Sequence, residues 1–212
     1  MTGIAAKTAK GRPVDGQKTL QVFAAIDSIL EEQGIARLSI ERIAKTAGIS
    51  KVTLYRRFDT LQGVIGAYVE TFTSEAMALD SLEAAPRPSS VEQMEAELNR
   101  LGVRLMELIS QPRVMAFDNA IAAGGPQYQA LKEQLYSQGP GRAMRHIASL
   151  FEHSGVHHPE VGTNDLAEML FLMWQSGFYP RLKFLGATTL EPSQLSQHVA
   201  VRTRIFLSSI QS

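Results

Sequence analysis

The sequence of 212 residues contains no cysteine, which excludes disulfide bonds, thiolate zinc sites and a cysteine nucleophile. No apolar run approaches the roughly 20 residues that a membrane-spanning helix needs, and the N-terminal stretch MTGIAAKTAKGRP lacks the apolar segment of a secretory signal. We therefore expect a cytoplasmic protein with no membrane partner. The sequence also lacks a Gly-rich phosphate loop, a nucleophile elbow and an HExxH motif, so it predicts no catalytic residue, no cofactor and no enzyme.

A net charge is absent as well, but the charges are unevenly distributed along the chain. Residues 1–60 hold 10 Lys and Arg against 6 Asp and Glu, whereas residues 61–212 hold 11 against 15. A basic N-terminal quarter on a mildly acidic remainder is typical of a nucleic-acid-binding module joined to a second unit. On charge alone, a chance fluctuation explains the difference equally well.

Strand patterns are also missing, whereas nearly every segment has the apolar spacing of an amphipathic helix. The predicted helices cover residues 17–33, 40–47, 51–58, 61–82, 91–109, 112–123, 127–154, 164–185 and 192–209. Gly139, Pro140 and Gly141 should kink or split the long segment that ends at residue 154. The stretch EAAPRPSS, residues 83–90, has the composition of a linker. The sequence therefore predicts an all-α fold.

The stretch GISKVTLYRRF, residues 48–58, combines cations with apolar residues in a way that a helix explains. A short helix capped by Ser39 precedes it, and after a tight glycine-containing turn Ser50 caps the next helix. At about 100° per residue, Leu54 and Phe58 fall on the same side of that helix and should face inward. The opposite side and its flanks hold Lys51, Val52, Thr53, Tyr55, Arg56 and Arg57. Two short helices joined by such a turn are the elements of a helix-turn-helix, whose second helix enters the major groove of DNA.

The outward side of this second helix has residue types that suit DNA. Arg donates bidentately to guanine, Thr and Val meet a thymine methyl group or a base edge, and Lys, Tyr and Ser suit phosphates. The alternative is a solvated helix face, but such a face rarely combines Val, Thr and Tyr with three cations and so little acid. The predicted DNA-binding residues of this helix and its cap are Ser50, Lys51, Val52, Thr53, Tyr55, Arg56 and Arg57.

The segment IARLSIERIAKTAGISKVTLYRRF, residues 35–58, resembles the signature of the TetR family of transcriptional regulators. The shared features are a Thr or Ser that opens the second helix, then I-A, A-G-V/I-S, T-L-Y and a closing F, and the resemblance covers about residues 18–70. It implies an N-terminal three-helix helix-turn-helix DNA-binding head, followed by a helical ligand-binding and dimerisation domain. It also implies that Ser39 contacts a DNA phosphate.

Two positions depart from the family pattern. Members often have a small residue where this chain has Val52, which suggests an altered base preference, and a lysine where it has Leu61, which removes an expected phosphate contact. Upstream, Gly11, Arg12 and Pro13 resemble the core of arms that thread an arginine into a narrow A·T-rich minor groove. We therefore add Arg12 to the predicted DNA contacts, with an unstructured basic tail as the alternative.

The resemblance further implies a homodimer on a near-palindromic operator of double-stranded DNA, because one head reads only one half-site. The last two helices are the implied dimer surface, where Gly177 is expected to permit close helix approach. The candidate interface residues are Leu170, Gly177, Phe178, Val199 and Phe206. An intramolecular core without a dimer is the alternative, since both uses need the same apolar pattern.

A small lipophilic ligand is implied among the middle helices, where methionine could adapt a cavity to an irregular shape. The candidate pocket residues are Met94, Leu98, Leu101, Leu105, Phe117, Phe151, Met169, Met173 and Trp174. Core packing is the alternative for each of them. His153, His157 and His158 have no spacing that fixes ligands on one helix face, so we predict a loop and no metal site.

These observations predict a dimeric DNA-binding repressor that a small lipophilic ligand releases from its operator. The alternative is a helical enzyme or protein-interaction module that carries a DNA-binding head. The predicted organisation is a flexible basic arm at residues 1–16, a helix-turn-helix domain at 17–62 and a helical ligand-binding and dimerisation domain at 63–212.

Overall fold

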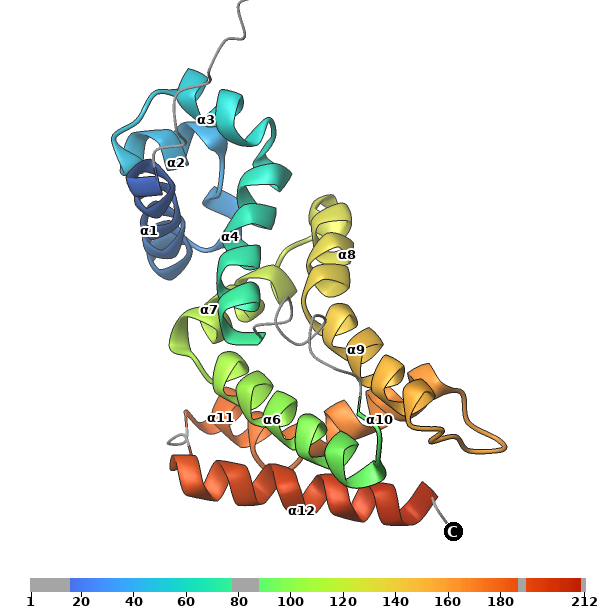
Figure 1. The fold of residues 1–212 in the computed structure, drawn as a ribbon. Helices are drawn as coiled ribbons and strands as arrows, with labels where there is room; N and C mark the ends of the chain where they lie inside the picture. Colours follow the sequence, from blue (N-terminus) through green and yellow to red (C-terminus); the bar gives the residue numbers. More distant parts are fainter. Residues whose placement is uncertain (1–15, 78–87, 187–189, 211–212) are drawn as a thin grey trace, which may run out of the picture.

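The computed structural model describes residues 16–77, 88–186 and 190–210, which form helices and turns without any strand. Figure 1 shows a head at one end, α4 leading away from it, and a helical body at the other end. The helices are α1 (Gly16–Gln33), α2 (Ile40–Ala47), α3 (Lys51–Phe58), α4 (Leu61–Met77), α6 (Val91–Ile109), α7 (Pro112–Ala122), α8 (Gln129–Gln138), α9 (Pro140–His153), α10 (Thr163–Gln175), α11 (Tyr179–Leu185) and α12 (Pro192–Ile210), with short 3-10 turns η1 (Ile35–Arg37) and η2 (Pro126–Tyr128). The all-α prediction is confirmed.

The head consists of α1, α2 and α3 packed around a common apolar core. Ile26 of α1, Ile43 of α2 and Leu54 of α3 are completely buried. Gly34 ends α1 and Gly48 ends α2. Their φ angles are positive, 71° at Gly34 and 66° at Gly48, a conformation that residues with a side chain rarely adopt. The sequence predicted both stops, because a glycine follows directly on each apolar pattern.

Helix α4 joins the head to the body. Its first turn is capped by Thr60, whose Oγ1 accepts a hydrogen bond of 3.0 Å from the Gly63 amide. It packs against α3 at one end and against α6 and α8 farther along. The predicted domain boundary between residues 62 and 63 therefore falls within an unbroken helix that both parts share, and the division itself stays a prediction.

The body is built around the crossing of α6 with α10 and α12 (Figure 1). A Cβ atom at Gly102 of α6 would lie 2.6 Å from Cγ1 of Val199 and 2.9 Å from Cε2 of Trp174. Trp174 is completely buried, and its indole Nε1 donates a hydrogen bond of 3.0 Å to Oγ1 of Thr203. Close helix approach therefore occurs at Gly102.

The C-terminal part differs from the sequence prediction at one break. A single helix over residues 164–185 was expected, but α10 ends at Gln175 and α11 begins at Tyr179. Gly177 between them has a φ of 70°, and Pro180 lies in the first turn of α11, so this glycine makes a turn and the prediction of an unbroken helix was wrong. The split expected around Gly139 is confirmed, since α8 ends directly before it.

Two other predictions concern the segment that follows α4. The fourth helix was expected to reach residue 82, and the linker to span residues 83–90. Residues 78–87 lie outside the described residues. Within the described part, Ser90 caps α6, because its side chain accepts a hydrogen bond of 3.3 Å from the Gln93 amide.

Candidate nucleic-acid interface and ligand cavity

Local hydrogen bonds fix the geometry of the α2–turn–α3 unit. The Ser39 hydroxyl accepts from the Arg42 amide at 3.2 Å and caps α2, while the Ser50 hydroxyl accepts from the Thr53 amide at 3.1 Å and caps α3. Between the helices, the Ile49 amide donates to the Ala44 carbonyl at 3.0 Å. The turn is thus set by short-range contacts that the sequence itself specifies.

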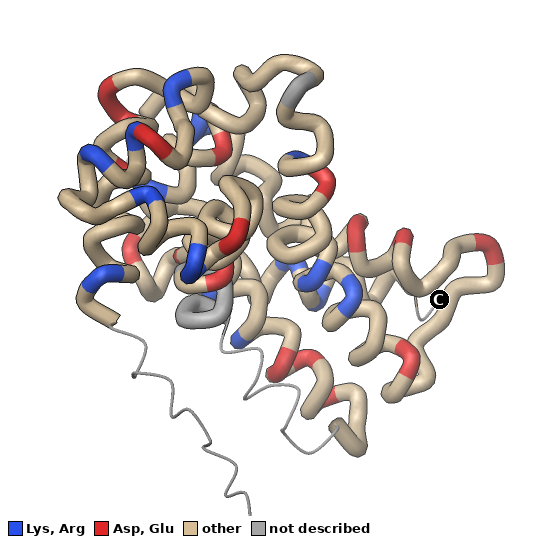
Figure 2. Tube along the Cα trace, turned by 90° about the horizontal axis from the view of Figure 1, so that it is seen from above, with Lys and Arg blue, Asp and Glu red and all other residues tan. Residues whose placement is uncertain are grey.

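Helix α3 has a buried side and an exposed side, as the sequence predicted. Leu54 is completely buried, and Phe58 is half-buried against the head core. On the other side Val52 is 75% exposed, Tyr55 is 49% exposed and Arg56 is exposed. Figure 2 views the molecule from the side of the head and shows Lys and Arg positions there, interspersed with acidic ones. A valine this exposed suits a surface that meets a partner.

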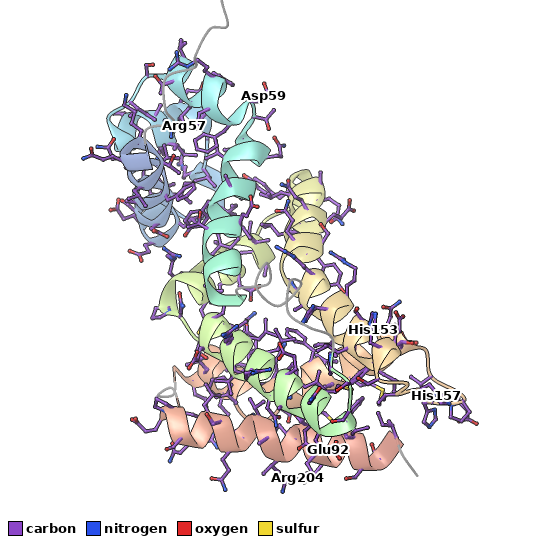
Figure 3. The ribbon with its side chains drawn as sticks, in the orientation of Figure 1. Arg57, Asp59, Glu92, His153, His157 and Arg204 are labelled. Atoms are coloured by element: carbon purple, nitrogen blue, oxygen red, sulfur yellow. The ribbon has the colours of Figure 1, made fainter. Side chains whose placement is uncertain are left out.

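Two predicted cations of α3 already have protein partners. Lys51 donates to Glu41 of α2 at 3.0 Å, and this hydrogen bond lowers the pKa of the Glu41 carboxyl. Arg57 is half-buried and donates to Oγ1 of Thr19, so it joins α3 to α1 (Figure 3). Glu41 was not predicted from the sequence, although its place in the first turn of α2, ten residues before Lys51, is visible there.

Helix α2 borders the same side of the head. Arg42, Lys45 and Thr46 line a shallow depression together with Ser39 and Glu41. No role was predicted from the sequence for Arg42, Lys45 or Thr46, although two of them are cations beside the predicted recognition unit. Arg12 lies outside the described residues.

The body contains a cavity of about 410 Å³, a size that suits a small ligand. Helices α4, α6, α7, α8, α9, α10 and α11 contribute to its wall. The apolar part of the wall includes Val69, Leu105, Phe117, Ile121, Leu135 and Phe171. An apolar lining with a few polar groups is the general character of small-molecule sites.

Only Leu105 and Phe117 of the predicted pocket residues line this cavity. The other predicted pocket residues are packed in or against the core of the body, except Met169, which lies at its surface. Met94, Leu98, Leu101, Phe151 and Trp174 are completely buried in the core, Met173 packs against that core, and Met169 is 48% exposed. Helical spacing identified apolar faces but did not show which face borders empty space.

One end of the cavity carries a polar cluster formed by α7 and α11. The Asp118 Oδ2 atom accepts from the Tyr179 hydroxyl at 3.1 Å and from Lys183 Nζ at 2.8 Å. Burial, together with the charge of Asp118, raises the pKa of Tyr179 to about 12, so this hydroxyl stays protonated at neutral pH. None of these three residues was predicted from the sequence.

A continuous series of aromatic rings leads from the cavity to α3. The ring of Phe117 lies 5.6 Å from that of Tyr68 on α4, which lies 5.5 Å from Phe23 on α1, which lies 6.5 Å from Phe58 at the end of α3. The Tyr68 hydroxyl also donates to Asp27 of α1. We call the four residues Phe117, Tyr68, Phe23 and Phe58 the aromatic chain.

The predicted dimer residues are mostly inside the monomer. Leu170, Phe178, Val199 and Phe206 are buried, whereas Gly177 is exposed in the turn between α10 and α11. Apolar side chains nevertheless remain exposed on α10 and α12. This exposed strip consists of Met169 and Leu172 on α10 and Val201 and Ile205 on α12.

His153 and His157 lie at one edge of the body, away from the head. Figure 3 shows His153 at the outer end of α9 and His157 in the loop beyond it. Within the described ranges, no three His, Cys, Asp or Glu side chains are grouped closely enough to hold a metal ion. None of the helices in those ranges has the length and apolar character needed to cross a membrane.

Comparisons with known proteins agree with this geometry. Residues 22–67 match the sequence profile described as "Bacterial regulatory proteins, tetR family". The HTH-type transcriptional regulator EthR of Mycobacterium tuberculosis (strain ATCC 25618 / H37Rv) is 31% identical over 84 residues, a segment that spans 39% of this chain and 39% of that regulator. The profile match covers the head and the beginning of α4, and the aligned segment spans less than half the length of EthR.

Solved structures extend the likeness to the body. The structure of the "Flavonoid-responsive Regulator FrrA" has a TM-score of 0.69 at 22% identity and covers 92% of this chain and 97% of that chain. The structure of a TetR family transcriptional regulator from Pseudomonas syringae pv. tomato str. DC3000 has a TM-score of 0.63 at 18% identity. The match covers 92% of this chain and 97% of that chain. At these identities the likeness shows a shared fold.

A capped helix-turn-helix head on an all-α body defines a protein of the helix-turn-helix class. The profile match over the head and the similarity to EthR place it more narrowly. Residues 22–67 of the chain resemble the TetR family of bacterial regulatory proteins, in agreement with the resemblance noted in the sequence.

Proposed function

We propose that the chain is a DNA-binding transcriptional regulator, a dimeric repressor that a small lipophilic ligand releases from its operator. The exposed side of α3 is the observation that carries this proposal. Val52, Tyr55 and Arg56 are presented to solvent, while Leu54 on the opposite side fixes the helix to the head core. The match of residues 22–67 to the TetR profile supports the same conclusion.

Each outward side chain has a chemical role in this proposal. Arg56 reads a guanine edge, and Val52 with Thr53 meets a thymine methyl group or base edge. Lys51 and Tyr55 contact phosphates, which position the protein without carrying sequence information. Ser39 and Ser50 add phosphate contacts at two helix N-termini, and Arg12 inserts into a narrow A·T-rich minor groove. Arg57 supports α3 through Thr19, a positioning role rather than a base contact.

A homodimer would place two heads on a near-palindromic operator and cover the exposed strip on α10 and α12. Leu172 is 53% exposed and Ile205 is 57% exposed, and burying such side chains is favourable. In this proposal the exposed strip forms the dimer interface in place of the buried residues that the sequence suggested. The interface still lies on the C-terminal helices. Two-fold symmetry would bring the same strip of each copy together.

The cavity of the body is the proposed ligand site. Its wall contains the rings of Phe117, Phe171 and Tyr136, which suit an aromatic molecule. FrrA is named a flavonoid-responsive regulator, and a flat aromatic ligand would be compatible with the wall of the cavity in this chain. The ligand must bind the DNA-incompetent conformation better, and a coupling of about 1–3 kcal/mol would weaken operator binding about 5–150-fold.

A footprint of the purified protein on the DNA upstream of its own gene tests the proposal. We expect protection of a site with near two-fold symmetry, and repression of a reporter placed behind that site. Absence of any protected site, with only salt-sensitive binding to every sequence, would contradict it. We also expect no turnover by the purified protein, and a reaction catalysed by the body would favour an enzyme that carries a DNA-binding head.

A further inference from the structure

Among the residues whose side chains the structure describes, the charged groups that line the cavity are not balanced. Two lysines, Lys132 of α8 and Lys183 of α11, line the wall together with one carboxylate, that of Asp118. Lys183 and Asp118 form an ion pair of 2.8 Å, and the Tyr179 hydroxyl completes this cluster at 3.1 Å. The carboxylate is therefore already used by the cluster, and Lys132 supplies the excess positive charge.

The partner of Lys132 among the described side chains and backbone is neutral. Its Nζ donates to the carbonyl oxygen of Gly124 at 2.7 Å, and no carboxylate of the described ranges pairs with it. The Lys132 residue is partly buried. An ammonium in that position gains more from an anion than an exposed one does, because hydrogen bonds between charged partners are stronger and less screened.

From this imbalance we propose that the cavity takes an acid: an apolar molecule that carries a single carboxylate, which pairs with Lys132. The inference rests on the proposed function and specifies the ligand of the same site. The apolar body would lie against Leu105, Phe117, Ile121 and Phe171, which a small inorganic anion would leave unfilled. Both aliphatic and aromatic acids share this chemistry.

A purely structural role for Lys132 predicts different behaviour. Gly124 follows the C-terminal end of α7, so the Lys132 side chain links this end to α8. If that were its whole role, removing the charge would lower stability without affecting the choice between an acid and its neutral analogue. The ratio of those two affinities therefore separates the two roles.

The experiment measures binding of matched pairs to the full-length chain by calorimetry. Naphthalene-2-carboxylate is compared with naphthalene-2-carboxamide, and decanoate with decanamide. We expect one of the two acids to bind about 10–100-fold more tightly than its amide, the effect of one charge-assisted hydrogen bond. Which pair shows the preference distinguishes an aromatic from an aliphatic ligand.

Variants of Lys132 locate the effect. In Lys132→Met the acid and the amide should bind equally, in Lys132→Arg the preference should persist, and in Lys132→Glu it should reverse toward the amide. Equal binding of acid and amide to the wild type would overturn the proposal, as would an undiminished preference in a folded Lys132→Met protein or a failure of both acids to bind. Operator binding is measured separately without any ligand, so those results leave the DNA-binding proposal intact.

Discussion

The ring of Phe117, which lines the cavity of the body, lies 5.6 Å from the ring of Tyr68, whose hydroxyl donates to Asp27 in the head. Tyr68 is almost completely buried, with 1% of its surface exposed. Through Phe23 the aromatic chain continues to Phe58 at the end of α3. The wall of the cavity and α3 are therefore connected by a series of side chains, each of which lies against the next.

Removing the Tyr68 hydroxyl should weaken the attachment of α4 to α1. Tyr68→Phe keeps the ring but leaves the Asp27 carboxylate without this donor, and we expect the free energy of unfolding to fall by about 1–3 kcal/mol. Urea denaturation measures the change. Tyr136→Phe is the matched control, because Tyr136 is 57% exposed and no hydrogen bond of its hydroxyl occurs among the described residues. An equal effect in both variants would contradict the expected role of the Asp27 contact.

Shortening the aromatic chain should reduce the coupling between the two sites. In Phe117→Leu the cavity keeps an apolar wall but loses the ring that meets Tyr68. We expect the bound acid to weaken operator affinity by a smaller factor than in the wild type, and the operator to weaken acid binding by the same smaller factor. Anisotropy titrations with and without the acid give both factors. An unchanged coupling in a variant that binds both partners would show that other contacts transmit the change.

Much of the head could be predicted because its signals are local. Ser39, Gly48 and Ser50 determine the ends of α2 and α3 through contacts within a few residues, and Leu54 marks the buried side of α3 by its spacing. The pairing of Lys51 with Glu41 could not be predicted from local signals, because it depends on how α2 and α3 cross.

The body could be predicted only as a set of helices. Periodicity showed that α10 has an apolar face, but burial of Leu170 and exposure of Leu172 depend on how α6, α9 and α12 pack against it. The same limit applies to the cavity, whose wall combines residues of seven helices. The break at Gly177 has a visible signal in the nearby Pro180, which the sequence prediction of one helix did not use.

The exposed strip predicts where a charge should disrupt the dimer. Ile205→Asp places a carboxylate on α12 where the side chain is 57% exposed, so the monomer should fold normally while the dimer dissociation constant rises at least about tenfold. Sedimentation equilibrium measures it. Val52→Asp, at the opposite end of the molecule, is the control and should leave the dimer intact (Figure 1). Phe206→Asp would not serve, because Phe206 is 1% exposed and its change would unfold the chain.

Leu54 and the outward residues of α3 should separate stability from DNA binding. Leu54 is completely buried, so Leu54→Ala opens a cavity in the head and should cost about 2–5 kcal/mol of folding free energy. DNA binding should then fall only as far as the folded fraction falls. Thermal denaturation in parallel with operator titration tests this. Normal stability with impaired operator binding would mean that Leu54 faces DNA instead of the core.

Arg56 and Lys51 should fail in different ways if α3 reads DNA. Arg56→Ala should keep the fold, lose about 1–3 kcal/mol of operator affinity and relax the preference at one position of each half-site. Lys51→Ala should weaken all sequences alike and flatten the salt dependence by about one unit for each phosphate that is no longer neutralised, so about two in a dimer.

Glu41 gives the opposite change at the same place. In the free protein its carboxylate holds Lys51 at 3.0 Å, and it would compete with a phosphate for that ammonium. Glu41→Gln should therefore strengthen binding to operator and scrambled DNA alike, because it removes a negative charge from the surface that meets the phosphates. Salt titrations of Glu41→Gln, Lys51→Ala and Arg56→Ala on both DNAs provide the measurement. If all three folded variants bind as the wild type does, the exposed side of α3 is only solvated and another surface must contact DNA.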